Sequence, residues 1–241
     1  MRLIHFTIQE YLSAHPDIFS TPHSLVAEIC LTYLNSETAN AIQADSSSSI
    51  HDTPFLEYCS LYWGIYAKGQ LSDRAKSLAL ELLQGNDDHI STQLLLRQVR
   101  GPRLGTFGTN FCFSGLHSAS FFGISEVVTT LIKMECCDIN GGDIWGRSPL
   151  SWAARNGHGE VVKILLGREE VKPDKLDNDG ATPLSYAAEY GHEEVVKILL
   201  EREVNPDKPD HGGQTPLSYA AQNGDEGVVK TLLGREEVDP D

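Results

Sequence analysis

The chain has 241 residues, enough for one large domain or two ordinary ones, and it carries 34 acidic against 19 basic side chains, a net charge of −15. This negative charge opposes phosphate backbones and anionic lipid, so the composition disfavours nucleic-acid binding. No apolar stretch approaches the ~20 residues that a membrane-spanning helix needs, so we expect no membrane insertion.

The first hundred residues are expected to form helices. Thr21 and Pro22 predict the start of one helix that runs to about Leu34, Thr53 and Pro54 the start of a second, and Ser72 that of a third. A fourth helix is expected at roughly 89–99. The apolar faces expected for the first three helices are Leu25, Val26, Ile29 and Tyr33; Leu56, Cys59, Tyr62, Trp63 and Tyr66; and Ala75, Leu78, Ala79, Leu82 and Leu83.

After a predicted linker at 101–108, the chain repeats itself. Leu150, Leu184 and Leu217 recur at spacings of 34 and 33 within the pattern Ser/Thr-Pro-Leu-Ser-aromatic-Ala-Ala, and a weaker copy around Leu116 lies 34 residues before Leu150. Four repeats are therefore expected over residues 109–142, 143–176, 177–209 and 210–241.

Each repeat is expected to be a pair of short helices. The Ser or Thr before Pro caps the first helix, and Gly157, Gly191 or Gly224 ends it. The second helix opens with acidic residues and continues as Val-Val-Lys-x-Leu-Leu, which gives one apolar face. Helices this short are marginal alone, so the repeats must stack. The predicted class is all-α: a helical N-terminal region followed by an α-solenoid of about four repeats.

The repeat pattern resembles the ankyrin consensus, which has a period of ~33 residues and the signature Thr-Pro-Leu-His-x-Ala. The family's His survives only as His117, and Ser151, Ser185 and Ser218 replace it, so we expect weaker bracing of the turns and lower stability. The resemblance implies a non-catalytic module that binds a protein, of unknown identity, through the hairpin tips and the first helices on its concave face. By this resemblance the partner-binding residues are Ile144, Trp145, Arg147, Arg155, Asn156, Asn178, Asp179, Ala181, Glu189, Tyr190, His211, Gln214, Gln222 and Asn223.

Trp145 is the sharpest of these candidates, because large aromatic side chains at exposed tips are typical of interface hot spots. The alternative is that it packs against Phe111, Phe113 or the linker. Tyr190 has the same two interpretations, whereas the tyrosines that follow Ser185 and Ser218 are expected to be structural.

The N-terminal half also resembles a known family. Residues 3–12 and 27–35 are similar to the winged-helix end and the following helices of fungal NACHT–ankyrin proteins, the NOD-like receptors of fungi, and residues 54–58 with Tyr62 and Trp63 extend the similarity. The Gly-x-x-x-x-Gly-Lys-Ser/Thr phosphate loop of their NTPase is missing. The resemblance implies that the chain is a fragment or a truncated descendant of such a receptor.

Nothing in the sequence assembles a catalytic, cofactor-binding or metal site. His192 begins like a zinc-protease motif but lacks the second His, and we expect His158 and His192 to start second helices instead. Two alternatives stay open. One is an enzyme with an unrecognised pocket between the two halves, using His5, His51 or Cys59 with acids of the repeats. The other is a scaffold that associates with itself through the uncapped fourth repeat, whose apolar residues are Val228, Val229, Leu232 and Leu233.

The cysteines suggest a reducing compartment. They are five in number and show no C-x-x-C pair, so we expect buried, reduced thiols. The N-terminus lacks the uninterrupted apolar core of a secretory signal, and the sequence holds no Asn-x-Ser/Thr acceptor. An intracellular, cytoplasmic location is therefore expected.

Overall fold

The computed structural model describes residues 22–40, 54–68, 71–84, 89, 91–92, 94–96, 113–134 and 137–234. The chain divides into two compact units, Met1–Phe111 and Cys112–Asp241. The described residues form α-helices joined by turns and contain no strand, which confirms the all-α class. The predicted linker at 101–108 lies outside the described residues.

In the N-terminal unit, three helices begin where the sequence predicts. They are α2 (Pro22–Leu34), α4 (Pro54–Tyr66) and α5 (Asp73–Gln84), with a further short helix α3 (Glu37–Asn40) that was not expected. Helix α2 packs against both α4 and α5. The Ser72 hydroxyl accepts a hydrogen bond from the Ala75 N–H at 3.1 Å, which caps α5. Residues 91–92 and 94–96 are helical, within the fourth predicted helix.

The apolar face predicted for α2 is only partly right, since Val26 is 4% exposed while Leu25 and Tyr33 are partly exposed. Ile29 is 45% exposed, whereas Ala27, Cys30, Leu31 and Leu34 are at most 1% exposed. The helix carries two apolar stripes of similar strength, and periodicity alone cannot choose between them. Helix α2 packs against α4 and α5, and the stripe that starts at Ala27 is the more deeply buried one.

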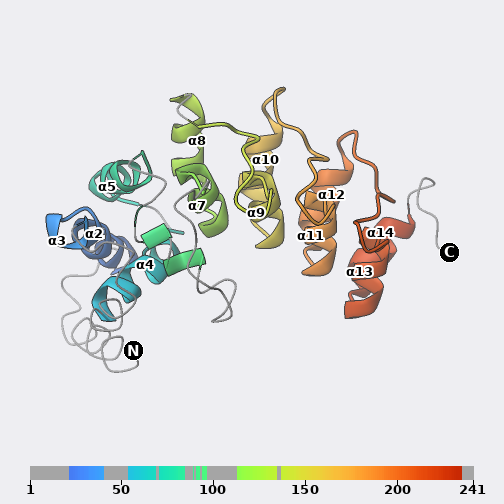
Figure 1. The fold of residues 1–241 in the computed structure, drawn as a ribbon, viewed down its shortest axis with the longest axis horizontal. Coiled ribbons are helices and arrows are strands. Elements are labelled where there is room, and N and C mark those ends of the chain that lie inside the picture. The colour runs from blue at the N-terminus through green and yellow to red at the C-terminus, as the bar shows by residue number, and fades with distance from the viewer. Residues whose placement is uncertain are drawn as a thin grey trace. The chain divides into compact units, whose positions relative to one another are not determined.

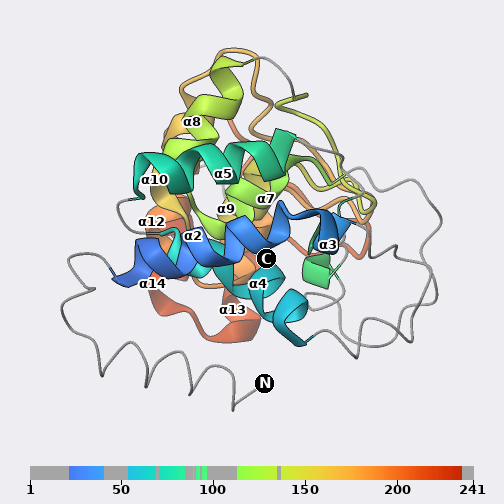
Figure 2. The same cartoon turned by 90° about the vertical axis from the view of Figure 1, so that its left-hand side faces the viewer.

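The C-terminal unit is a stack of four helix pairs (Figure 1), as predicted. Each first helix packs on its own second helix and on the first helix of the next pair, and the second helices pack on one another in the same order. In Figure 2 the second helices lie along one side of the stack and the first helices along the other. The pairs are α7 (Gly115–Phe122) and α8 (Ser125–Lys133); α9 (Pro149–Arg155) and α10 (Gly159–Leu166); α11 (Pro183–Glu189) and α12 (Glu193–Leu200); and α13 (Pro216–Asn223) and α14 (Glu226–Leu233).

The recurring leucines occupy equivalent layers of this stack. Leu116, Leu150 and Leu184 are at most 2% exposed, while Leu217 in the fourth repeat is partly exposed. Each first helix from α9 onward begins with Pro after a capping hydroxyl, and Thr182, for example, accepts a hydrogen bond from the Ser185 N–H at 3.1 Å. Local capping and burial of the leucine stripe therefore act together to form each pair.

Neighbouring repeats are joined where the first helix turns into the second. Gly157 has φ +72°, and a Cβ there would lie 2.7 Å from Nδ1 of His192 in the next repeat. His192 in turn donates from Nε2 to the backbone oxygen of Arg155 at 3.0 Å, and His158 bonds Phe121 in the same way at 2.9 Å. Both histidines directly precede second helices, as predicted, and their ring nitrogens join repeats.

Candidate functional site

The hairpin tips that precede the first helices are organised by an aspartate. In the third repeat, one carboxylate oxygen of Asp177 accepts the N–H groups of Asp179 and Ala181 at 2.9 and 2.8 Å. Its other oxygen accepts the Tyr186 hydroxyl at 2.5 Å, which ties the tip to α11. Burial and this hydrogen bond raise the pKa of Tyr186, so the phenol stays a proton donor.

The tips of the second and fourth repeats use the same device. Asp143 accepts the Trp152 Nε1–H at 2.9 Å, and Asp210 accepts the Tyr219 hydroxyl at 2.5 Å. Burial raises the pKa of Asp143, although the hydrogen bonds it accepts act in the opposite direction. Each tip is therefore held by its own first helix, and at the second tip His117 adds hydrogen bonds to the backbone oxygens of Gly141 and Arg147.

The tips are also joined to one another. The backbone oxygen of Trp145 accepts the Asn178 N–H at 2.8 Å, and that of Asp179 accepts the His211 N–H at 2.9 Å. Three successive tips thus form a continuous row beside the first helices. We call this row together with the exposed side of the first helices the first-helix face.

An arginine–aromatic cluster lies on the first-helix face between the second and third repeats. Arg147 donates from Nε to the Tyr186 hydroxyl at 2.8 Å, and the same nitrogen lies 3.9 Å from an oxygen of Asp177. Its guanidinium carbon lies 5.0–5.3 Å from three ring centroids, a distance at which cation–π attraction operates. The cluster consists of Trp145, Arg147, Trp152, Arg155, Tyr186 and Tyr190.

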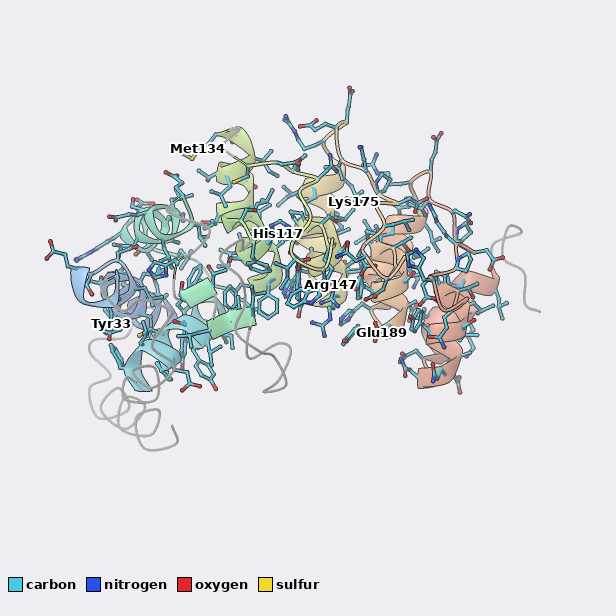
Figure 3. All side chains as sticks on the ribbon, viewed as in Figure 1. Tyr33, His117, Met134, Arg147, Lys175 and Glu189 are labelled. Carbon is cyan, nitrogen blue, oxygen red and sulfur yellow. The ribbon has the colours of Figure 1, made fainter. Side chains whose placement is uncertain are left out.

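Arg155 belongs to the same cluster. Its Nη2 donates to the Tyr190 hydroxyl at 2.6 Å, and its guanidinium carbon lies 4.7 and 5.4 Å from the ring centroids of Tyr190 and Trp152. Glu189 is half-buried and lies within electrostatic reach of both arginines. Figure 3 labels Glu189 and Arg147. Burial raises the pKa of Glu189, while attraction to Arg155 and then Arg147 opposes that rise.

Trp145 combines features of both sequence interpretations. Its ring packs edge-on against Trp152, with centroids 6.3 Å apart, and under the guanidinium of Arg147, yet it remains partly exposed. Phe113 is buried against Trp152 and His117, and Phe111 lies outside the described residues. Trp145 is therefore held in place by the cluster.

The structure divides the remaining predicted site residues into three groups. Ala181 was a wrong prediction, because it is 7% exposed and lies under the tip that Asp177 organises. Three asparagines bond backbone oxygens, of Trp152, Ile144 and Glu189 respectively, and so hold the framework. Ile144 is partly exposed and lies at the second tip. The asparagines are Asn156, Asn178 and Asn223. The third group has exposed or partly exposed side chains on the first-helix face and consists of Asp179, Tyr190, His211, Gln214 and Gln222.

Sequence reasoning missed Trp152 as a component of the site. It is fully buried, and it contacts both arginines, Trp145 and Asp143. The signal was present, because an aspartate precedes the aromatic residue by nine positions in three consecutive repeats.

Of the residues suggested for a catalytic pocket, Cys59 is fully buried on α4, and His5 and His51 lie outside the described residues. A hydrogen bond with Cys30 and then burial raise the pKa of the Cys59 thiol, which works against forming a thiolate. Cys59 is therefore unsuited to act as a nucleophile. The described residues hold no cluster of metal-ligating side chains, and none of their helices is long and apolar enough to cross a membrane.

A family profile described as ankyrin repeats in three copies matches residues 79–177, 116–210 and 169–241, which together exceed half of the chain. The chain belongs to the ankyrin repeat family. Its ankyrin repeats support a protein-binding module. The chain is also 46% identical over 57 residues to a protein of Arabidopsis thaliana named "Probable protein S-acyltransferase 23". That stretch is 24% of this chain and 11% of the relative, so the two share only a small part of the relative's length.

Proposed function

We propose that the chain is a non-catalytic adaptor whose first-helix face binds a segment of another protein. One observation carries the proposal: the arginine–aromatic cluster presents the partly exposed ring of Trp145, the exposed ring of Tyr190 and two partly exposed guanidiniums on a face that is already ordered by the Asp-to-aromatic hydrogen bonds of the tips. Interfaces are enriched in Trp, Tyr and Arg, and preorganised side chains lose less entropy on binding.

The proposal is tested by the position of cross-links. A photo-reactive amino acid at Gln222, on the exposed first-helix face, should give a discrete cross-linked species in an extract of the native cell. The matched control carries the same amino acid at Arg202, which is exposed in the turn after α12.

A Tyr190→Ala change should lower the yield of that species at least tenfold while the thermal unfolding midpoint stays within about 2 °C, because Tyr190 is 43% exposed. Equal yields from Gln222 and Arg202 would contradict the proposal.

The N-terminal unit supports a narrower proposal about origin. We infer that it corresponds to the helical arm of a fungal NACHT–ankyrin protein, since the residues that carry this resemblance, 54–58 with Tyr62 and Trp63, form most of α4. Superposition of α2, α4 and α5 on an experimental structure of such an arm tests it. A different helix order or packing would refute it.

A cytoplasmic location is part of the same proposal. Cys30 and Cys59 are free thiols, which agrees with a reducing compartment. The earlier alternative of self-association through the fourth repeat is tested by light scattering at several concentrations. A constant mass would exclude it over that range.

A further inference from the structure

The guanidinium of Arg155 is held in one orientation by the repeat that follows it. Tyr190 accepts its Nη2–H at 2.6 Å and also presents its ring at 4.7 Å, and Trp152 presents a second ring at 5.4 Å. The backbone of Arg155 is fixed as well, because its carbonyl oxygen accepts the His192 Nε2–H at 3.0 Å. A long side chain that is normally mobile has thereby lost much of its freedom before any ligand arrives.

Arg155 nevertheless makes no ion pair with any residue that the structure describes. Its neighbour Arg147 differs, because Asp177 lies 3.9 Å from its Nε and its side chain is only 19% exposed. A guanidinium offers five N–H donors in a planar fork that matches a carboxylate, and only one donor of Arg155 has an acceptor in the described structure. Among the described residues no acceptor occupies the remaining donors of Arg155, which can therefore bind a ligand.

Glu189 carries the kind of carboxylate that a guanidinium binds, yet it forms no hydrogen bond with Arg155 in the described structure. It feels the attraction of both arginines but forms no ion pair with either within the described residues. Its negative charge lowers the local positive potential and would repel an incoming carboxylate. Glu189 therefore disfavours binding of an acidic ligand. Removing its charge should strengthen such binding, whereas removing the charge of Arg155 should weaken it.

We propose that Arg155 binds an aspartate or glutamate carboxylate of the partner segment, and that the rings of Tyr190 and Trp145 contact an apolar residue next to it. Charge decides the kind of segment. The chain as a whole carries −15, so a run of acids would be repelled, whereas a single carboxylate flanked by apolar residues meets a local guanidinium. This inference rests on the proposed function and names the chemistry of its ligand.

The test uses a displayed library of random twelve-residue peptides, selected in parallel on the intact chain and on its Arg155→Met variant. The intact chain should select peptides enriched in Asp or Glu next to apolar residues, and the variant should not. An Arg202→Met variant, which removes an exposed arginine away from the first-helix face, should select the same peptides as the intact chain.

Affinities of one selected peptide then measure the contact. Arg155→Met should weaken binding ~10- to 100-fold, as expected for a lost charge-assisted hydrogen bond. Replacing the peptide's acid by its amide should weaken binding similarly, with little further loss on Arg155→Met, because the two changes remove one interaction. Glu189→Gln should strengthen binding several-fold. Arg155→Lys keeps the charge without the planar fork, so its affinity should lie between those of the intact chain and the Arg155→Met variant. Such an intermediate affinity shows that the weaker binding of Arg155→Met is not due to loss of folding.

The outcomes separate the inference from the function. Two outcomes would overturn the inference and leave the proposed function standing. In the first, the selected peptides lose binding to the Tyr190→Ala variant but are not enriched in acids. In the second, they bind the Glu189→Gln variant more weakly than the intact chain. If no peptide is selected over a blank surface, both are overturned for peptide ligands.

Discussion

At the scale of single residues, His117 shows how one side chain can join two repeats. Its Nδ1 accepts the Ser114 N–H at 3.1 Å, so the proton must be on Nε2, which lies 3.1 Å from the backbone oxygens of both Gly141 and Arg147. The ring is thus neutral and caps α7 while it holds the next tip. Burial lowers the pKa of His117 to about 4, although the bonds to Gly141 and Arg147 act in the opposite direction.

This lowered pKa predicts a loss of stability in mild acid. The unfolded chain takes up a proton near pH 6.5 and the folded chain only near 4, so His117 contributes stability above pH 6.5 that is lost as the pH falls from 6.5 towards 4. At pH 5 the loss is about 2 kcal/mol. Urea unfolding at pH 7 and pH 5, followed by far-ultraviolet circular dichroism, measures it.

The control variants separate this residue from general acid effects. His117→Ser should be less stable than the intact chain at pH 7 by about 1–3 kcal/mol, and should lose about 2 kcal/mol less between pH 7 and pH 5. His211→Ser, at an exposed side chain, should behave like the intact chain. Parallel pH curves for all three would refute the role assigned to His117.

Residue patterns in the sequence predict some of the contacts in the site but not all of them. The nine-residue spacing from Asp177 to Tyr186, repeated in the two neighbouring tips, was readable and predicts a hydrogen bond within one repeat. The pairing of Arg155 with Tyr190 was not readable, because it joins residues 35 positions apart in two repeats. Its geometry depends on the rise and twist between layers, which the sequence does not express as a local pattern.

At the scale of elements, the turn between first and second helices decides how closely repeats approach. Replacing Gly157 by Ala forces a side chain into φ +72° and puts its Cβ 2.7 Å from His192 Nδ1. The backbone strain should cost roughly 1 kcal/mol and the clash about 1–3 kcal/mol more. Gly224→Ala is the matched control, since Gly224 has φ +76° and nothing within 4 Å of the added Cβ.

The difference between the two alanine variants isolates the contact between repeats. Thermal unfolding of both, together with the His192→Ala variant and the Gly157→Ala, His192→Ala double variant, completes the cycle. The double variant should recover part of the extra cost, because the crowded ring is gone. If Gly157→Ala and Gly224→Ala destabilise equally, the close approach of His192 has no energetic weight.

Element positions were better predicted than element faces. Pro22, Pro54 and Pro183 mark helix starts through chemistry that acts within a few residues, and the structure begins helices at each. The buried side of α2 was missed, with Ile29 exposed at 45%, since burial depends on which partners arrive from elsewhere in the chain. Repeats reduce this uncertainty because their partner is another copy of the same pattern.

At the scale of the whole repeat unit, protection should decline towards the fourth repeat. Leu184 and Ala188 of α11 are fully buried, whereas Leu217 is partly exposed and Ala221 is exposed on α13. We expect amides of α13 and α14 to exchange with solvent at least tenfold faster than those of α11 and α12, because local opening there exposes less apolar surface and so costs less free energy. Native-state hydrogen exchange read by mass spectrometry of peptides measures this, and equal protection in the two repeats would contradict it.

Arg155 is fastened to the third repeat twice, by its carbonyl oxygen to His192 and by its guanidinium to Tyr190. A pulling force applied through a ligand on that guanidinium would therefore be shared between α9 and α11 from the outset. Load on this one side chain would thus enter two repeats at once.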